Sequence, residues 1–130
     1  MLSERLFGRK DIMVEKTLDA LAMRMGAISD NIANINTPGY IRQDVHFEDA
    51  LAEAYEATPR YKPIDPHTAP TALEMLQVRP VRVGEPQRLD GNTSSVEAEM
   101  SRMVETAIAY NAMVRHTGFK TLKDIIANSK

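Results

Sequence analysis

Residues 31–40 read N-I-A-N-I-N-T-P-G-Y, and this stretch predicts where the first long helix ends and how the chain turns. Thr37 precedes a proline, and the proline ring disfavours helical geometry at the residue before it. Pro38 and Gly39 suit the two central positions of a type II turn, because glycine takes a positive φ without steric cost. Asn34 and Asn36 can serve the last helical carbonyls or tolerate a left-handed conformation. No catalytic pattern occurs here, so the stretch predicts a structural joint.

The residues before this turn, 11–36, are predicted to form one long helix of about 39 Å, at about 1.5 Å per residue. The apolar residues step alternately by four and three, which is the narrow seam of a coiled coil rather than the wider face of a surface helix. The seam consists of Val14, Leu18, Leu21, Met25, Ile28, Ile32 and Ile35.

A second long helix is predicted over residues 95–127, with Ser94 and Glu97 forming a capping box at its start. Its apolar row has the same spacing and then drifts after Gly118, where a kink or break is expected. The main row consists of Val96, Met100, Met103, Ala107, Tyr110 and Val114, and after Gly118 it drifts to Phe119, Leu122 and Ile126. We expect the rows of both helices to cover each other and to form the assembly interface.

The segment between the long helices has a different composition. A short helix is expected near residues 47–57, while residues 58–92 contain six of the seven prolines, which excludes a continuous helix. Residues 76–78 and 81–83 alternate weakly and could form a short β-ribbon. The rest of 58–92 is predicted to be extended and mobile until it binds something.

These elements predict a mainly α fold, with long terminal helices packed as a coiled-coil-like pair and a short proline-rich, extended or weakly β middle segment. The chain has 130 residues, 43% of them hydrophobic, but only 5% aromatic, which favours helix-on-helix packing. We expect one structural unit in three parts. Residues 1–51 hold the first helix and turn, 52–92 the short helix and proline-rich segment, and 93–130 the last helix.

The last helix also carries apolar residues outside its main row. These are Val104, Ile108, Leu122 and Ile125. Because two helices alone cannot cover them, we expect neighbouring subunits to complete the core. The alternative is that residues 58–92 fold back as the missing layer.

Composition and motifs exclude several classes of function. A formal net charge of −2 gives no general attraction to nucleic acid, and the absence of cysteine excludes disulfides and cysteine–zinc sites. The start of the chain lacks the apolar run of a cleaved secretory signal, so export would use a route without cleavage. Asp44, His46 and Glu48 alternate, but no second histidine has metal-ligand spacing, so a solvated polar stretch is favoured. We expect no catalytic residue, metal, cofactor or small-molecule substrate.

The turn stretch resembles the N-terminal signature of the flagellar axial proteins, the rod, hook and hook-associated families. Their first helix ends in Asn-x-x-Asn-x-x-Thr-x-Gly-Tyr/Phe, and the matching residues are Asn31, Asn34, Thr37, Gly39 and Tyr40. The continuation R-Q-D-V-H-F-E-D-A-L, together with A-Y-N-A-M-V in the last helix, is similar to proximal-rod members. The resemblance covers residues 11–51 and 88–127. Residues 52–87 carry none and are too few for the large β domains of hook and distal-rod proteins.

The resemblance implies a structural protein rather than an enzyme. Such proteins leave through the flagellar type III export apparatus, and their terminal helices pack as concentric layers in a rod that crosses the periplasm and transmits torque to the hook. The implied partners are further copies of the chain, the export apparatus and other rod proteins, including FlgC and FliE. Three alternatives remain open at this point: another axial paralogue such as FlgC, a helical adaptor or export chaperone, and a small metal-dependent enzyme centred on His46.

Overall fold

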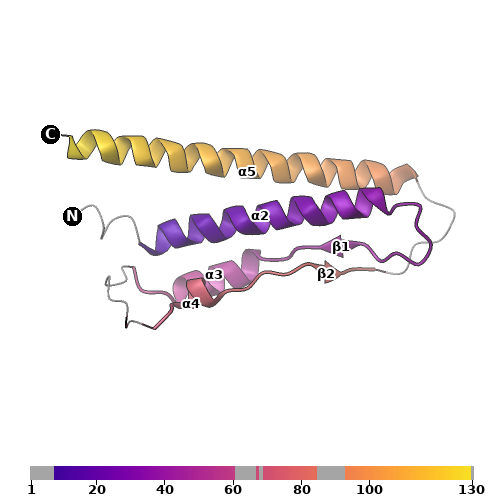
Figure 1. Cartoon of the computed structure of the whole chain (residues 1–130), viewed down its shortest axis with the longest axis horizontal. Helices are drawn as coiled ribbons and strands as arrows, with labels where there is room; N and C mark the ends of the chain where they lie inside the picture. Colours follow the sequence, from indigo (N-terminus) through magenta and orange to yellow (C-terminus); the bar gives the residue numbers. More distant parts are fainter. Residues whose placement is uncertain (1–7, 61–66, 68, 85–92, 130) are drawn as a thin grey trace.

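The computed structural model describes residues 8–60, 67, 69–84 and 93–129, without the side chains of residues 93–95. The fold is mainly α, as predicted. Its helices are α2 (Arg9–Ala33), α3 (Glu48–Glu56), α4 (Ala72–Met75) and α5 (Thr93–Asn128), and its strands are β1 (Gln43–Asp44) and β2 (Val81–Arg82). Figure 1 shows three layers, with α2 between α5 on one side and the group of α3, α4, β1 and β2 on the other. We call that group the middle layer.

The two long helices run antiparallel and side by side (Figure 1). Near the start of α2, Lys120 of α5 forms an ion pair with Asp11. At the other end of α2, Asn31 donates a hydrogen bond to Glu99 near the start of α5. The predicted packing of the two terminal helices is therefore confirmed.

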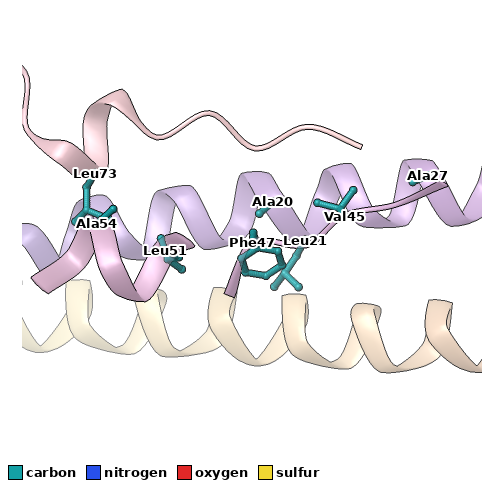
Figure 2. Close-up of a cluster of buried hydrophobic side chains, with 8 residues drawn as sticks. All are labelled: Ala20, Leu21, Ala27, Val45, Phe47, Leu51, Ala54 and Leu73. Atoms are coloured by element: carbon teal, nitrogen blue, oxygen red, sulfur yellow. The ribbon is translucent and has the colours of Figure 1, made fainter. Parts of the chain in front are cut away.

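The hydrophobic core lies between α2 and the middle layer, not between the two long helices. Figure 2 shows its eight buried residues, none of which belongs to α5. They are Ala20, Leu21, Ala27, Val45, Phe47, Leu51, Ala54 and Leu73. Among the partly buried hydrophobic residues of the described part of α5, Tyr110 is the one that packs against this cluster. The buried apolar contacts of α2 are thus made mainly with residues 45–54 and 73.

Residues 69–84 are largely extended, as predicted, but they pack against the core rather than standing apart from it. The rest of the predicted extended segment, at residues 61–66, 68 and 85–92, lies outside the described residues. Leu73 is 0% exposed. The helix that carries it begins with a capping box, in which Thr71 accepts from the Glu74 N–H and Glu74 accepts from the Thr71 N–H. Such a box satisfies the free N–H groups of a helix start directly after Pro70. The structure therefore agrees in part with the alternative that residues 58–92 fold back, because residues 69–84 help to form a third layer.

The two short strands pair differently from the predicted ribbon. β1 and β2 are antiparallel, with Gln43 opposite Arg82 and Asp44 opposite Val81. Residues 81–82 therefore pair with the segment after the turn and not with residues 76–78. A tight hairpin between residues 76–78 and 81–83 would need a backbone N–H donor at residue 80, and proline has none. Leu76 and Val78 pack against the core instead.

The last helix, α5, differs from its prediction at two places, the expected cap at Ser94 and the expected break at Gly118. It includes Ser94, so Ser94 does not precede the helix as a cap, and the side chain of Ser94 lies outside the described part. The helix also continues through Gly118 without a break. None of the described helices is long and apolar enough to cross a membrane.

Candidate assembly joint

Asn34 closes the C-terminal end of α2. Its Nδ2 donates to the Asp30 carbonyl at 2.8 Å, and its backbone N–H donates to the same oxygen at 3.0 Å. Thr37 then donates its hydroxyl to Asn34 Oδ1 and its N–H to the Asn34 carbonyl. Both residues thus satisfy backbone groups that a helix end leaves without partners.

The turn itself spans Thr37 to Tyr40 and is closed by the Tyr40 N–H, which donates to the Thr37 carbonyl at 3.2 Å. Gly39 has a φ of 76°, as the type II turn at Pro38 and Gly39 requires. No atom lies within 4 Å of the position that a Cβ at Gly39 would take. Backbone conformation, and not crowding, therefore explains the glycine.

Asn31 is the buried residue of the turn stretch, at 1% exposure, and its amide uses every hydrogen-bonding position. Its Oδ1 accepts from the Tyr40 hydroxyl at 3.0 Å and the Gln43 N–H at 2.8 Å. Its Nδ2 donates to the Gln43 carbonyl at 2.7 Å and to Glu99 Oε2 at 3.2 Å. Asn31 therefore binds the returning chain to α2 and also binds α5.

Glu99 completes this contact from α5. The carboxylate is buried, and its Oε1 accepts from Arg42 Nε at 2.7 Å and from Arg102 Nη1 at 2.8 Å. Two arginines and an amide thus compensate a charge that burial alone would disfavour. We call Asn31, Tyr40, Arg42, Gln43 and Glu99 the Asn31 clasp.

The electrostatics of the clasp affect its tyrosine. Burial raises the pKa of the Tyr40 phenol above its usual value, and the negative charges of Asp30 and Glu99 raise it further. Arg42 and Arg82 act in the opposite direction but do not cancel the increase. The phenol thus remains protonated at neutral pH and can donate to Asn31.

Sequence reasoning named Asn31 and Tyr40 but missed Arg42, Gln43, Glu99 and Arg102 as parts of the joint. A signal for Glu99 was available. On α5 the inward residues Met103, Thr106, Tyr110 and Met113 follow Glu99 at steps of four and three, so a carboxylate occupies an inward position. The partner of such a buried charge cannot be read from spacing, because Arg42 lies 57 residues away.

Three basic residues of α2 bind the middle layer and were also missed. Arg9 donates to the Tyr55 carbonyl in the last turn of α3 and to the Thr58 carbonyl just after it, and it stacks on the Tyr55 ring. The Lys16 ammonium donates to the Glu74 and Leu76 carbonyls at the end of α4. Cations are favourable at helix C-termini, where carbonyls lack partners.

The third basic residue, Arg24, fixes the start of α3. Arg24 donates to the Val45 carbonyl from Nε at 3.0 Å and from Nη2 at 2.5 Å. Its guanidinium also forms an ion pair with Glu48 at 2.7 Å and stacks on the ring of Phe47. Burial raises the pKa of Glu48, but its hydrogen bonds with Arg24 and with the Phe47 N–H outweigh this, so the net pKa is lowered. In the sequence, Arg9, Lys16 and Arg24 are spaced by seven and eight residues along α2. That spacing was the signal from which these three residues could have been found.

The polar stretch weighed as a metal site is dispersed in the structure. His46 Nε2 lies 3.9 Å from Asp44, while Glu48 is engaged with Arg24. Across the described ranges, no group of three His, Cys, Asp or Glu residues is placed to hold a metal ion.

The predicted apolar rows lie in different surroundings. In the α2 row, Leu21 and Ile28 are buried and the other five are half-buried. In the α5 row, Val96, Met103, Ala107 and Tyr110 are half-buried, whereas five are exposed. These five are Met100, Val114, Phe119, Leu122 and Ile126. The expectation that the two rows cover each other is therefore wrong for these five exposed residues of α5, and the role of both rows as an assembly interface stays a prediction.

Several of the residues that α5 turns inward are polar, and they take positions that apolar residues of the predicted row would otherwise occupy. Thr106 is buried and donates its hydroxyl to the Arg102 carbonyl one turn earlier, at 2.7 Å. Thr117 does the same to Met113 at 2.9 Å. Threonines that satisfy their hydroxyls within their own helix can face another helix without an interhelical partner.

The opposite side of α5 carries exposed apolar residues, which we call the outer stripe. It consists of Val104, Ile108, Phe119, Leu122 and Ile126. Their exposures range from 58% to 77%, and their spacing of 4, 11, 3 and 4 keeps them on one side of a helix with 3.6 residues per turn. So large an exposed apolar surface indicates an interaction site.

Comparison with known proteins shows which proteins this chain resembles. A family model described as "Flagella basal body rod protein" matches residues 15–40, which include most of α2 and the whole turn. The matched part thus contains Asn31, Asn34, Thr37, Gly39 and Tyr40.

Curated relatives extend the similarity to most of the chain. The flagellar basal body rod protein FlgB of Borreliella burgdorferi is 29% identical over 131 residues, covering 92% of this chain and 97% of the relative. FlgB of Escherichia coli K12 is 27% identical over 109 residues, covering 74% and 75%. FlgB of Bacillus subtilis 168 is 24% identical over 119 residues, covering 90% and 92%. These matches confirm the resemblance to flagellar rod proteins, and the similarity is to FlgB.

Proposed function

We propose that this chain is a structural subunit of the bacterial flagellar basal body rod, in its proximal part. The observation that carries the proposal is the similarity to FlgB over 92% of the chain, which includes the residues of the turn and the clasp. The adaptor and export-chaperone alternative and the FlgC alternative are not favoured, since the similar proteins are described as FlgB.

The geometry supports a role in which stiffness matters and chemistry does not. The Asn31 clasp sets the angle at which the chain leaves α2 and ties that exit to α5. The outer stripe leaves α5 with apolar surface for neighbouring subunits. Close-packed helices resist sliding because movement would open cavities. Such a subunit transmits torque as a rigid element, without catalysis or a cofactor.

The partners follow from this role. The chain assembles with further copies of itself and with other rod proteins, among them FlgC and FliE. It reaches the periplasmic rod through the flagellar export apparatus, without a cleaved signal peptide. The apolar row of α2, with Val14, Leu18, Met25, Ile32 and Ile35 half-buried, and the exposed residues of α5 are the surfaces for these contacts.

The direct test is to isolate basal bodies from a strain that carries a tagged copy of this chain in place of its own gene. We expect the tag to co-purify with the rod and to be imaged at its cell-proximal end, and we expect deletion to abolish motility. A motile deletion strain, or a tag that stays in the cytosol with an export complex, would contradict the proposal.

A further inference from the structure

Two adjoining hollows form one groove along α2, between α5 and the middle layer. Their volumes are about 540 Å³ and 370 Å³, and they share Leu21, Arg24 and Ala109 in their linings. The floor runs along α2 from Met13 to Ile28, a distance of about 22 Å at 1.5 Å per residue. That length accommodates about four turns of a helix.

The groove is apolar in its larger hollow and acidic at its edge. Phe47, Leu51 and Met113 supply apolar walls from both sides. The carboxylates of Glu48 and Glu56 lie on the α3 side, and Arg24 pairs with only the first of them. An apolar groove with an acidic edge suits a helix that presents apolar residues flanked by basic ones.

The C-terminal half of α5 has this character. Phe119, Leu122 and Ile126 of the outer stripe are exposed, and Arg115 and Lys123 are exposed next to them. The acidic residue of this half, Asp124, is half-buried and lines the hollow near Lys120 and Asp11, away from the stripe. The exposed face of this half is therefore apolar and basic.

We propose that the groove of one copy receives the C-terminal half of α5 from a second copy, an inference that rests on the proposed function as an assembly subunit. A copy cannot fill its own groove, because Ala109 and Met113 of α5 already form one wall and the stripe lies on another side of this helix. Groove and stripe are different surfaces, so the contact is head-to-tail. Such contacts generate open helical assemblies or rings.

The contact can be mapped by disulfide formation, because the chain contains no cysteine. Ala52, which lines the groove and is exposed, is replaced in one tagged copy (Ala52→Cys), and Leu122 in a differently tagged copy (Leu122→Cys). We expect the mixed pair to cross-link under mild oxidation. The matched control is Thr121→Cys, which is also exposed but points about 100° away on the helix.

Equal cross-linking with Thr121→Cys, or no mixed disulfide at all, would overturn the contact. Disulfides formed only between two Ala52→Cys copies would also overturn it, because they would indicate a symmetric interface across α3. Circular dichroism of each variant establishes that the helices are intact.

A charge exchange tests the same contact independently. We expect Glu56→Lys and Lys123→Glu each to lower concentration-dependent association in sedimentation by several-fold at low salt. An equimolar mixture of the two variants should regain association, since each groove then finds an opposite charge. Unchanged association in both single variants would overturn the charge pairing.

The outcome separates this inference from the proposed function. A chain that enters isolated basal bodies but gives no disulfide between residues 52 and 122 keeps its rod role and loses this contact. A chain that forms the disulfide but is absent from basal bodies keeps the contact and loses the rod role.

Discussion

At the scale of single residues, the turn stretch combines two kinds of constraint. Gly39 and Asn34 have local effects: Gly39 allows the positive φ of the turn, and Asn34 closes the end of α2. Asn31 acts over long distances, because its amide joins the chain at Gln43 to α5 at Glu99. The first kind can be predicted from neighbouring residues, whereas the second requires the fold.

We expect Asn31→Ala to lower the free energy of unfolding by about 2–4 kcal/mol, since it leaves the Gln43 backbone groups and one Glu99 oxygen without partners, and buried unpaired groups cost about 1–3 kcal/mol each. Urea unfolding followed by circular dichroism measures this change. Asn36→Ala is the control, because Asn36 is exposed, and its effect should stay within about 0.5 kcal/mol. Equal effects at the two positions would show that the clasp does not stabilise the fold.

Gly39→Ala should destabilise the chain by about 1–2 kcal/mol, because a residue with a Cβ is strained at positive φ. Gly118→Ala is the matched control, and it should stabilise the chain instead. It lies inside α5 with nothing within 4 Å, and alanine favours a helix interior by about 1 kcal/mol. Thermal melting of both variants compares them.

We further expect Gly39→Val to be exported yet to impair rod assembly, and full motility would refute this role of the turn.

At the scale of elements, the docking of the middle layer depends on charged residues as much as on apolar ones. Arg9, Lys16 and Arg24 bind backbone carbonyls after α3, at the end of α4 and before α3, respectively. The apolar row of α2 predicted a long helix correctly, but it did not reveal what would cover that helix. The residues that cover it include Leu73, in a segment where prolines suggested disorder.

The Arg24–Glu48 contact should make this docking sensitive to acid. The pKa of Glu48 is lower in the folded chain than in the unfolded one, so the unfolded chain binds the proton more readily. The contact therefore stabilises the fold above the usual pKa of about 4.5 and is lost as the pH falls through the lower, folded-state pKa. In acid titrations of unfolding free energy, Glu48→Gln should remove this part of the pH dependence. The exposed Asp49→Asn should leave it unchanged.

At the scale of the whole molecule, the three layers are not equally stabilised. The core joins α2 to the middle layer, while both of the buried residues on the described part of α5, Glu99 and Thr106, are polar. The chain thus consists of a packed unit of two layers and a long helix that keeps most of its large apolar residues exposed. This distribution is typical of a subunit whose last helix is completed by neighbours.

We expect amide hydrogen exchange of the dilute chain to be faster along α5 after Tyr110 than along α2, because few buried contacts protect that half. Protection of residues 111–129 should rise with protein concentration or on assembly, whereas α2 should change little. Uniform protection of both helices in the dilute monomer would contradict this view. Leu122→Asp, a change at an exposed position, should prevent the gain in protection without unfolding α2.

The sequence by itself determined the local features of this protein: two long helices, the turn at Pro38 and Gly39, the closing role of Asn34 and the resemblance to rod proteins. These depend on neighbouring residues and on helical periodicity. The tertiary structure alone decided that Glu99 meets both Asn31 and Arg42, that residues 69–84 cover α2, and that α5 turns Glu99 and Thr106 inward. Two rows on α5 share the same spacing of threes and fours. Periodicity cannot tell which of them faces its own chain, because that depends on partners up to 109 residues away.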